Sequence, residues 1–283
     1  MVTRLRGDAA ATNVSRARAR RWPAAACVIL LTSLAACGTE ARTVASGDVA
    51  VLPAPPTPIA SDDSDVVAAQ ADLTQGHVWS AMKRLVPAVR SNQRRTPEAM
   101  LVTSRAIAAW YGWDELVRTL TPEPWLATRF DGEGYELLAR AALEHGDASL
   151  ARKDADLALH LARDPTARAV RLVLLARALD RLDQRDSAAA LYRRAADALP
   201  VVREWLWLRQ AGATKATEAR EKLYTKVRLA SVRARVPYTE AQALERFHLD
   251  VGAAAAYEAL GDMPSAFRLR LSSVTDPALR SGI

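Results

Sequence analysis

The sequence is poor in cysteine, histidine and phenylalanine, and each shortage narrows the range of functions. Its two cysteines are Cys27 and Cys37, so the chain beyond them has no disulfide, no thiol nucleophile and no cysteine metal site. The four histidines include no pair three or four residues apart and have no carboxylate at metal-ligand spacing; they are His77, His145, His160 and His248. The sequence therefore predicts no metal ion and no cofactor.

Short motifs of common enzyme sites are missing too. The chain contains no G-x-x-x-x-G-K-[ST], no G-x-G-x-x-G and no G-x-S-x-G, which are the signatures of phosphate-binding loops, dinucleotide folds and serine hydrolases. Several glutamates stand in ordinary helical contexts, where we expect solvated side chains rather than a general acid of raised pKa. These are Glu133, Glu136, Glu144, Glu204 and Glu258. We therefore predict a protein that is not an enzyme.

Beta structure has little support in the composition. There are only three phenylalanines, valine and isoleucine rarely alternate with polar residues, and alanine and leucine dominate an apolar half of the chain. The composition predicts an all-α fold.

The formal charge of +7 is concentrated at the N-terminus. Residues 1–36 hold six arginines and one aspartate, which is +5 of the +7 and leaves about +2 for the rest. So little net charge gives no reason to expect nucleic acid as a partner.

The N-terminal segment has the layout of an export signal. An arginine-rich stretch ends at Arg20-Arg21, and the apolar run over 23–36 that follows is too short to span a bilayer. Leu34-Ala35-Ala36-Cys37-Gly38 resembles a bacterial lipobox, with an ordinary signal peptide or a signal anchor as the alternative. The resemblance implies that Cys37 is lipidated after cleavage of residues 1–36. Gly38 after the cysteine implies anchoring at the periplasmic face of the outer membrane.

Residues 37–66 are rich in proline, alanine, serine and aspartate, including Pro53, Pro55, Pro56 and Pro58. Such a stretch favours extended backbone and cannot bury a core, so we expect a tether that spans a few tens of ångströms at roughly 3 Å per residue. The folded domain is predicted over 67–283.

Turn signals recur along that domain. The pairs Gly76-His77, Gly112-Trp113, Gly146-Asp147, Asp183-Gln184 and Gly261-Asp262 follow one another at 36, 34, 37 and 78 residues. These spacings are typical of helix–turn–helix repeats, which must stack because one hairpin cannot bury its own apolar face.

The repeats resemble the tetratricopeptide repeat over about 135–200. One unit supplies Tyr135, Leu138, Ala139, Gly146-Asp147, Ala151, Ala158 and Pro165, and the next supplies Leu172, Leu175, Ala176, Leu179, Ala188, Tyr192, Ala195 and Pro200. The resemblance implies an α-α superhelix of stacked hairpins. We expect Ala188 and Tyr192 to be buried at a hairpin contact, an irregular hairpin over 201–236, and a new helix capped by Thr239.

A weaker resemblance is to the N-terminal superhelix of soluble lytic transglycosylases, which cleave peptidoglycan. It rests on Trp205-Leu206-Trp207-Leu208-Arg209 and on the stretch from Tyr257 to Leu271. That family's catalytic domain has a Glu-Ser pair and a Gly-Leu-Met-Gln segment, and this chain has neither. The resemblance implies the scaffold of such an enzyme without its acid.

Two aromatic pairs are candidate ligand contacts. Trp110 and Trp113 are spaced to share one helix face, where they would pack in the core or stack a sugar. Trp205 and Trp207 are expected to point to different sides of their helix.

We therefore predict a cell-envelope lipoprotein that acts as an interaction scaffold, binding an envelope protein or peptide on the concave face of its repeats. Peptidoglycan is a further candidate partner. A basic stretch over 201–235 is either a solvated helix face or a binding surface for an acidic partner. Its candidate residues are Arg220, Lys222, Lys226, Arg228, Arg233 and Arg235.

Overall fold

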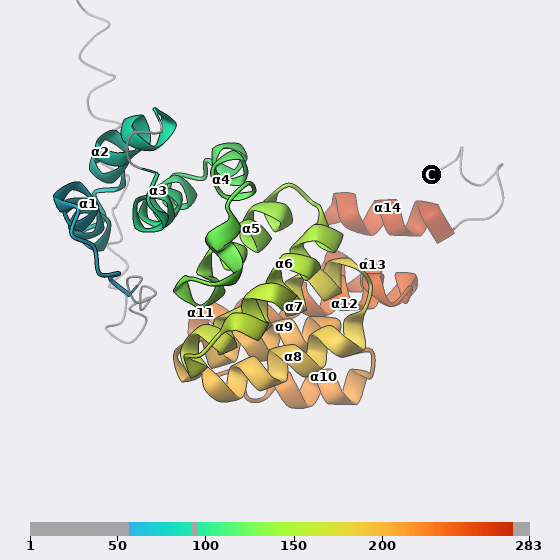
Figure 1. Cartoon of the computed structure of the whole chain (residues 1–283). Helices are drawn as coiled ribbons and strands as arrows, with labels where there is room; N and C mark the ends of the chain where they lie inside the picture. The colour runs from blue at the N-terminus through green and yellow to red at the C-terminus, as the bar shows by residue number, and fades with distance from the viewer. Residues whose placement is uncertain (1–56, 92–94, 274–283) are drawn as a thin grey trace, which may run out of the picture. The chain divides into compact units, whose positions relative to one another are not determined.

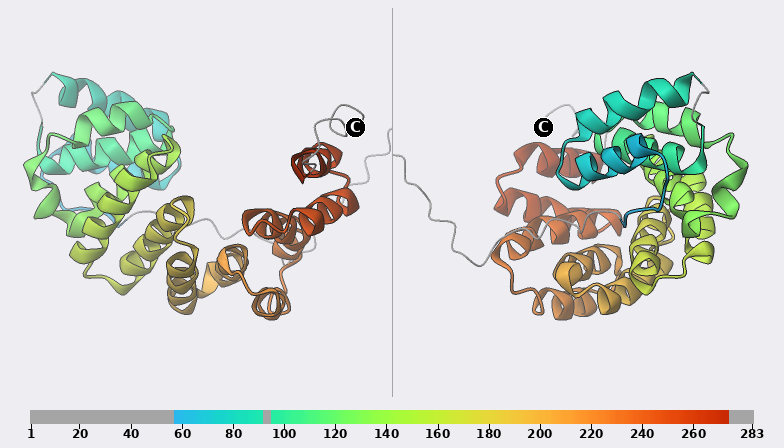
Figure 2. Two further views of the ribbon diagram at one scale, coloured as in Figure 1. Left: turned by 90° about the vertical axis from the view of Figure 1, so that its right-hand side faces the viewer. Right: turned by 60° about the vertical axis from the view of Figure 1, so that its left-hand side comes forward.

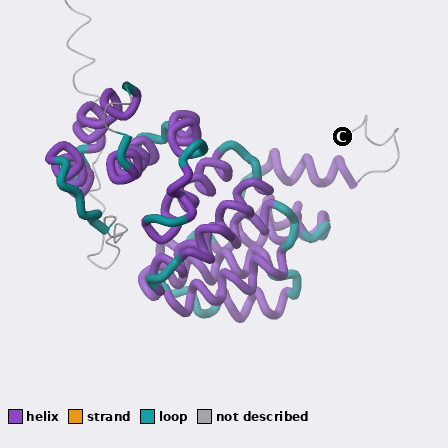
Figure 3. The backbone as a smooth tube through the Cα atoms, viewed as in Figure 1, coloured by secondary structure: helices purple, strands orange, loops and turns teal. Residues whose placement is uncertain are grey.

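The computed structural model describes residues 57–91 and 95–273, which are helical throughout apart from turns and short loops (Figures 1 and 3). The first helices are α1 (Ser64–Thr74), α2 (Val78–Arg90), α3 (Pro97–Ala109), α4 (Trp113–Leu120), the 3₁₀ turns η2 (Pro124–Ala127) and η3 (Phe130–Gly132), α5 (Glu133–Glu144), α6 (Ala148–Leu161), α7 (Pro165–Arg181) and α8 (Arg185–Ala198). The others are η4 (Pro200–Val202), α9 (Arg203–Ala213), α10 (Thr217–Tyr224), α11 (Ala230–Arg233), α12 (Val236–Arg246), α13 (Asp250–Ala259) and α14 (Met263–Ser273). None of the helices in these two ranges has the length and apolar character needed to cross a bilayer.

Polar side chains fix where several helices begin. The side chains of Asp63, Thr96, Asp147 and Asp164 each accept a hydrogen bond from a backbone N–H in the first turn of the helix that follows. Such caps satisfy N–H groups that the helix itself leaves without partners.

The capping by Asp63 places the start of α1 at Ser64, inside the range predicted as a tether. The chain ahead of α1 also packs on that helix, because Ile59 donates its N–H to Oε1 of Gln70 at 2.6 Å and accepts from Nε2 at 2.9 Å. The predicted boundary between residues 66 and 67 is therefore too late, since the aspartates assigned to the tether include a helix cap.

Successive hairpins share one turn geometry. In each, a residue in the left-handed region follows the first helix, and the next residue donates its N–H to a carbonyl five positions earlier, as in a Schellman motif. The left-handed residues are Gly76, Tyr111, Gly146, Asp183, His248 and Gly261. All five predicted turns are confirmed. The turn at His248 was not predicted, because its sequence has no glycine.

Neighbouring helices in the chain pack on one another from α1 through α9, and α9, α12, α13 and α14 continue the series (Figure 2). The first helices of consecutive hairpins also touch, as in α3 with α5 and α5 with α7. Alanines lie at many of these contacts, where a small side chain allows close approach of the helix axes. Ala188 and Tyr192 are buried as predicted, and the all-α solenoid of stacked hairpins is confirmed.

The expected irregular segment is confirmed over 201–236, where the short helices α10 and α11 both pack against α9. The predicted cap at Thr239 is wrong. Helix α12 begins at Val236, and the Thr239 hydroxyl donates to the Arg235 carbonyl at 3.0 Å inside the first turn. Pro237 explains the earlier start, because proline is favoured in a first turn, where its missing N–H costs nothing.

Candidate functional site

A groove among the described residues runs along the first helices of three consecutive hairpins, α5, α7 and α9. It encloses about 540 Å³. Its lining consists of Trp113, Arg140, Glu144, Val170, Val173, Leu174, Arg177, Leu199, Val202, Trp205, Leu206 and Arg209. The helices that form it are consecutive in the stack, so it is a continuous surface of the solenoid.

The floor of the groove is apolar. Val170 and Val173 of α7 are half-buried, and Trp205 of α9 is 40% exposed. Trp207 instead packs against the core between hairpins, so the prediction that the two tryptophans point to different sides is confirmed. The groove thus offers aliphatic and indole surface to an apolar ligand group.

Its charged residues are three arginines and one glutamate. Glu144 lies 3.7 Å from Arg177, and Arg140 pairs with Glu136 at 2.5 Å. Arg209 is exposed and has no ion pair within the described part of the chain. The lining therefore carries an excess of positive charge, which favours a ligand with carboxylate or other anionic groups.

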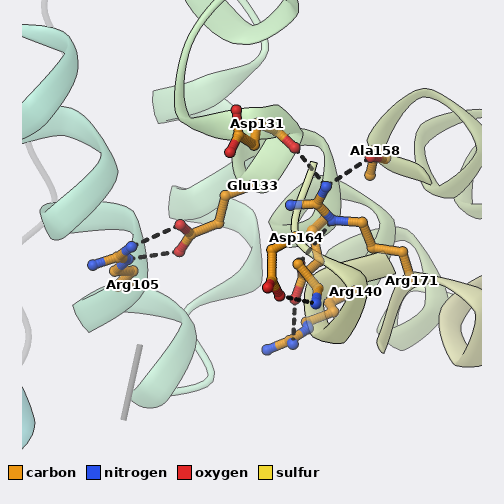
Figure 4. Close-up of polar contacts among 9 residues, drawn as sticks. Arg105, Asp131, Glu133, Arg140, Ala158, Asp164 and Arg171 are labelled. Carbon is orange, nitrogen blue, oxygen red and sulfur yellow. Dashed lines mark hydrogen bonds and ion pairs between the residues drawn. The ribbon is translucent and has the colours of Figure 1, made fainter. Parts of the chain in front are cut away.

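Two separate polar networks, each with a buried arginine, join hairpins (Figure 4). Arg105 of α3 binds Glu133 of α5 through two hydrogen bonds of 2.6 Å. Arg171 of α7, only 2% exposed, donates to Glu136 of α5 at 3.1 Å and to the carbonyls of Asp131 and Ala158 at 2.5 and 2.8 Å. Because Glu136 also accepts from Arg140, the second network fixes a guanidinium that lines the groove.

The expectation that Glu133 and Glu136 are solvated is wrong, because each pairs with a buried arginine 28 or 35 residues away. The remaining glutamates are paired as well. Glu204 accepts the N–H groups of Arg228 and Leu229 at 2.6 and 2.8 Å, and hydrogen bonding from Arg270 lowers the pKa of Glu258. At Glu258 this hydrogen bonding favours the ionised carboxylate over the protonated form.

Burial raises the pKa of Asp154 in α6 to about 6. Asp154 is absent from the lining of the groove. No grouping of histidine and carboxylate side chains suited to a metal ion occurs within 57–91 and 95–273.

The predicted basic surface needs correction at Arg220. Its side chain is fully buried and donates to both oxygens of Glu240 at 2.8 and 2.7 Å and to the Lys215 carbonyl at 2.7 Å. A charge count along the sequence cannot show a partner that follows 20 residues later. The other candidates are exposed: Lys222, Lys226, Arg228, Arg233 and Arg235.

The predicted pairing of Trp110 with Trp113 is also wrong. Trp110 ends α3 and Trp113 begins α4, so the turn at Tyr111 separates them. Trp113 lines the groove, whereas the ring of Trp110 lies 5.7 Å from that of Trp79. The spacing in the sequence did not reveal that Trp113 lines the groove or that Trp110 contacts Trp79, because the chain reverses direction between Trp110 and Trp113.

Cys37 and the signal segment lie outside the described residues. A scan against protein-family models finds none that matches this chain. A search of curated proteins likewise finds no match.

Proposed function

We propose that this chain is a non-enzymatic lipoprotein of the cell envelope whose helical repeats bind a segment of a partner protein. The proposal rests on the groove along α5, α7 and α9, which combines an apolar floor with three arginines. Stacked helical hairpins commonly present extended ligands with a continuous surface of this kind.

The lining indicates the chemistry of the partner. Val170, Val173 and Trp205 offer contacts to apolar side chains, and Arg177 and Arg209 offer charge-assisted hydrogen bonds to carboxylates. An extended segment with alternating acidic and apolar residues would satisfy both sets of contacts. We propose such a segment, carried by another envelope protein, as the ligand.

The anchor belongs to the same proposal. Lipidation of Cys37 would hold the repeats at the membrane, since two or three acyl chains give essentially permanent attachment. The lipobox-like sequence ending at Cys37 and the apolar run before it support this assignment. The proposed location is the periplasmic face of the outer membrane.

Selection from a displayed peptide library tests the groove. The bait is the chain from Cys37 onward, which includes every residue that the structure describes. We expect enriched peptides to carry acidic and apolar residues, and their capture to fall at least tenfold in Arg177→Glu/Arg209→Glu. Capture should also weaken in 0.5 M salt, because salt screens exposed charges.

Arg228→Glu/Arg233→Glu is the matched control, because it reverses two exposed arginines of α11 and the preceding loop, which lie outside the groove lining. Capture by the control should equal that of the unmodified chain. If both double variants lose peptide capture equally, binding depends on the overall charge of the domain and not on the groove. If Arg177→Glu/Arg209→Glu captures the enriched peptides as well as the unmodified chain does, the groove is rejected as the binding site.

A further inference from the structure

Three aromatic side chains near the start of the solenoid are exposed. Trp79 in the first turn of α2 is 55% exposed, Trp110 at the end of α3 is 57% exposed, and Tyr111 in the following turn is 79% exposed. The rings of Trp79 and Trp110 lie 5.7 Å apart with their planes inclined at 37°. We call these three residues the aromatic cluster.

Folding of the described residues does not explain the cluster. Tyr111 occupies a left-handed position with φ of 60°, where the equivalent residues of three other hairpins are glycines. A bulky residue in this conformation is strained, and its ring, which stays 79% exposed, makes an edge contact with Trp113 at 6.2 Å between ring centroids. Exposed apolar surface gathered at one place is typical of a contact site.

The entry point of the chain indicates what this site contacts. Ile59 is hydrogen-bonded to Gln70 in the second half of α1, and the turn after α1 leads directly to Trp79. The N-terminal chain thus joins the domain at the same hairpin that carries part of the aromatic cluster. If Cys37 holds the acyl chains, as the proposed function states, residues 38–56 connect the bilayer to this hairpin.

The length of that connection keeps the hairpin close to the membrane. A segment of this length spans at most roughly 60 Å at full extension. Tethering at such distances raises the effective concentration of the bilayer at the domain, so a weak additional contact suffices to orient it.

We propose that the aromatic cluster is a membrane contact and that Trp79, Trp110 and Tyr111 lie in the interfacial layer of the bilayer to which Cys37 is anchored. Tryptophan and tyrosine are enriched in this layer because each joins an apolar ring to a polar N–H or O–H. Lys83 is exposed one helical turn after Trp79, where its ammonium group can approach anionic headgroups. The planes of the two indoles are inclined at 37°, so the rings do not form one coplanar platform for a sugar.

Quenching of tryptophan fluorescence by lipids tests this contact. The chain from Cys37 onward has Cys37 as its only thiol, so a maleimide lipid couples it to vesicles of phosphatidylethanolamine and phosphatidylglycerol whatever its processing in cells. All contacts that the structure describes lie within 57–273, so this chain retains them. The quencher is a lipid with a doxyl group near the headgroup.

The sequence has seven tryptophans, and six of them follow Cys37 because Trp22 precedes it. We expect the lipid to quench roughly the share of the total fluorescence that two of these six tryptophans contribute. In Trp79→Phe/Trp110→Phe the quenching should disappear, because the reporters at the membrane are gone while apolar rings remain. Trp205→Phe/Trp207→Phe removes two tryptophans of α9 and should leave the quenching intact.

Unquenched emission from the coupled protein, or quenching that survives in Trp79→Phe/Trp110→Phe, overturns the proposal. If the protein dimerises with rising concentration and the dimer shields Trp79 and Trp110 from the quencher, the aromatic cluster binds a second copy of this chain. If soluble glycan fragments quench the fluorescence and the lipid does not, the cluster binds sugar. Either result rejects the membrane contact. Because coupling supplies the anchor chemically and the groove is not involved, these outcomes are separate from failure of the proposed function.

Discussion

The pair of Arg220 and Glu240 predicts an unequal response to loss of either partner. The Arg220 side chain is completely buried between α10 and α12, whereas the side chain of Glu240 is 27% exposed. Glu240→Gln removes the negative charge and leaves a guanidinium with no access to water. Arg220→Met leaves a carboxylate that still reaches solvent and keeps its 3.0 Å hydrogen bond from the Tyr224 hydroxyl.

Breaking a buried ion pair by removal of one partner costs about 3–5 kcal/mol. We expect Glu240→Gln to lower the free energy of unfolding by that amount, and Arg220→Met by about 2 kcal/mol, since water solvates part of the remaining charge. The double variant Arg220→Met/Glu240→Leu should cost less than the sum of the single changes, because it leaves no buried charge.

Urea unfolding followed by far-ultraviolet circular dichroism measures these differences, with Lys222→Met as control. Lys222 is exposed on the same helix and pairs with exposed Glu218, so its replacement should change stability by less than about 0.5 kcal/mol. If Glu240→Gln is no more destabilising than Lys222→Met, the buried pair does not exist in solution. If Arg220→Met is the worse of the two, the argument from exposure is refuted.

Three further predictions concern other parts of the chain. Burial raises the pKa of Asp154 from 3.8 to about 6, so the folded state binds this proton more tightly than the unfolded state does. The free energy of unfolding should therefore fall as the pH rises from 4 through 6. In urea unfolding, Asp154→Asn should raise it by about 2 kcal/mol at pH 7.5 and by little at pH 4. Ala188→Arg forces a charge into a fully buried helix contact and should destabilise by at least about 3 kcal/mol; wild-type heat stability would contradict the packing. Cys37→Ser should release the protein from membranes or leave an unprocessed precursor, and unchanged fractionation and gel mobility would reject lipidation.

The local features of the fold were predictable because they depend on residues close in sequence. Gly76, Gly146 and Gly261 mark turns through a conformation that glycine adopts readily, and alanine at Ala188 marks a close helix contact. The turn at His248 shows where this reasoning fails. Its geometry is the same, but no glycine marks it in the sequence.

The candidate site was less accessible, because its members come from separate hairpins. Trp113 and Trp205 line one groove, yet their distance in sequence gives no indication of this. Charge counting had the same weakness. It placed Arg220 with its exposed neighbours Lys222 and Lys226, although Glu240 holds it in the interior. Only the stacking of hairpins shows which charges line the groove.

The buried arginines also determine how rigid the groove is. Each repeat of a solenoid contacts only its neighbours, so the relative positions of α3, α5 and α7 depend on contacts between adjacent hairpins. Arg105 with Glu133 joins α3 to α5, and Arg171 with Glu136 joins α7 to α5. Satisfied polar networks require specific geometry. Arg171 with Glu136 therefore fixes the spacing of α5 and α7, two of the helices that carry the groove, and Arg140, held by Glu136, connects this pair to the surface proposed to meet the partner.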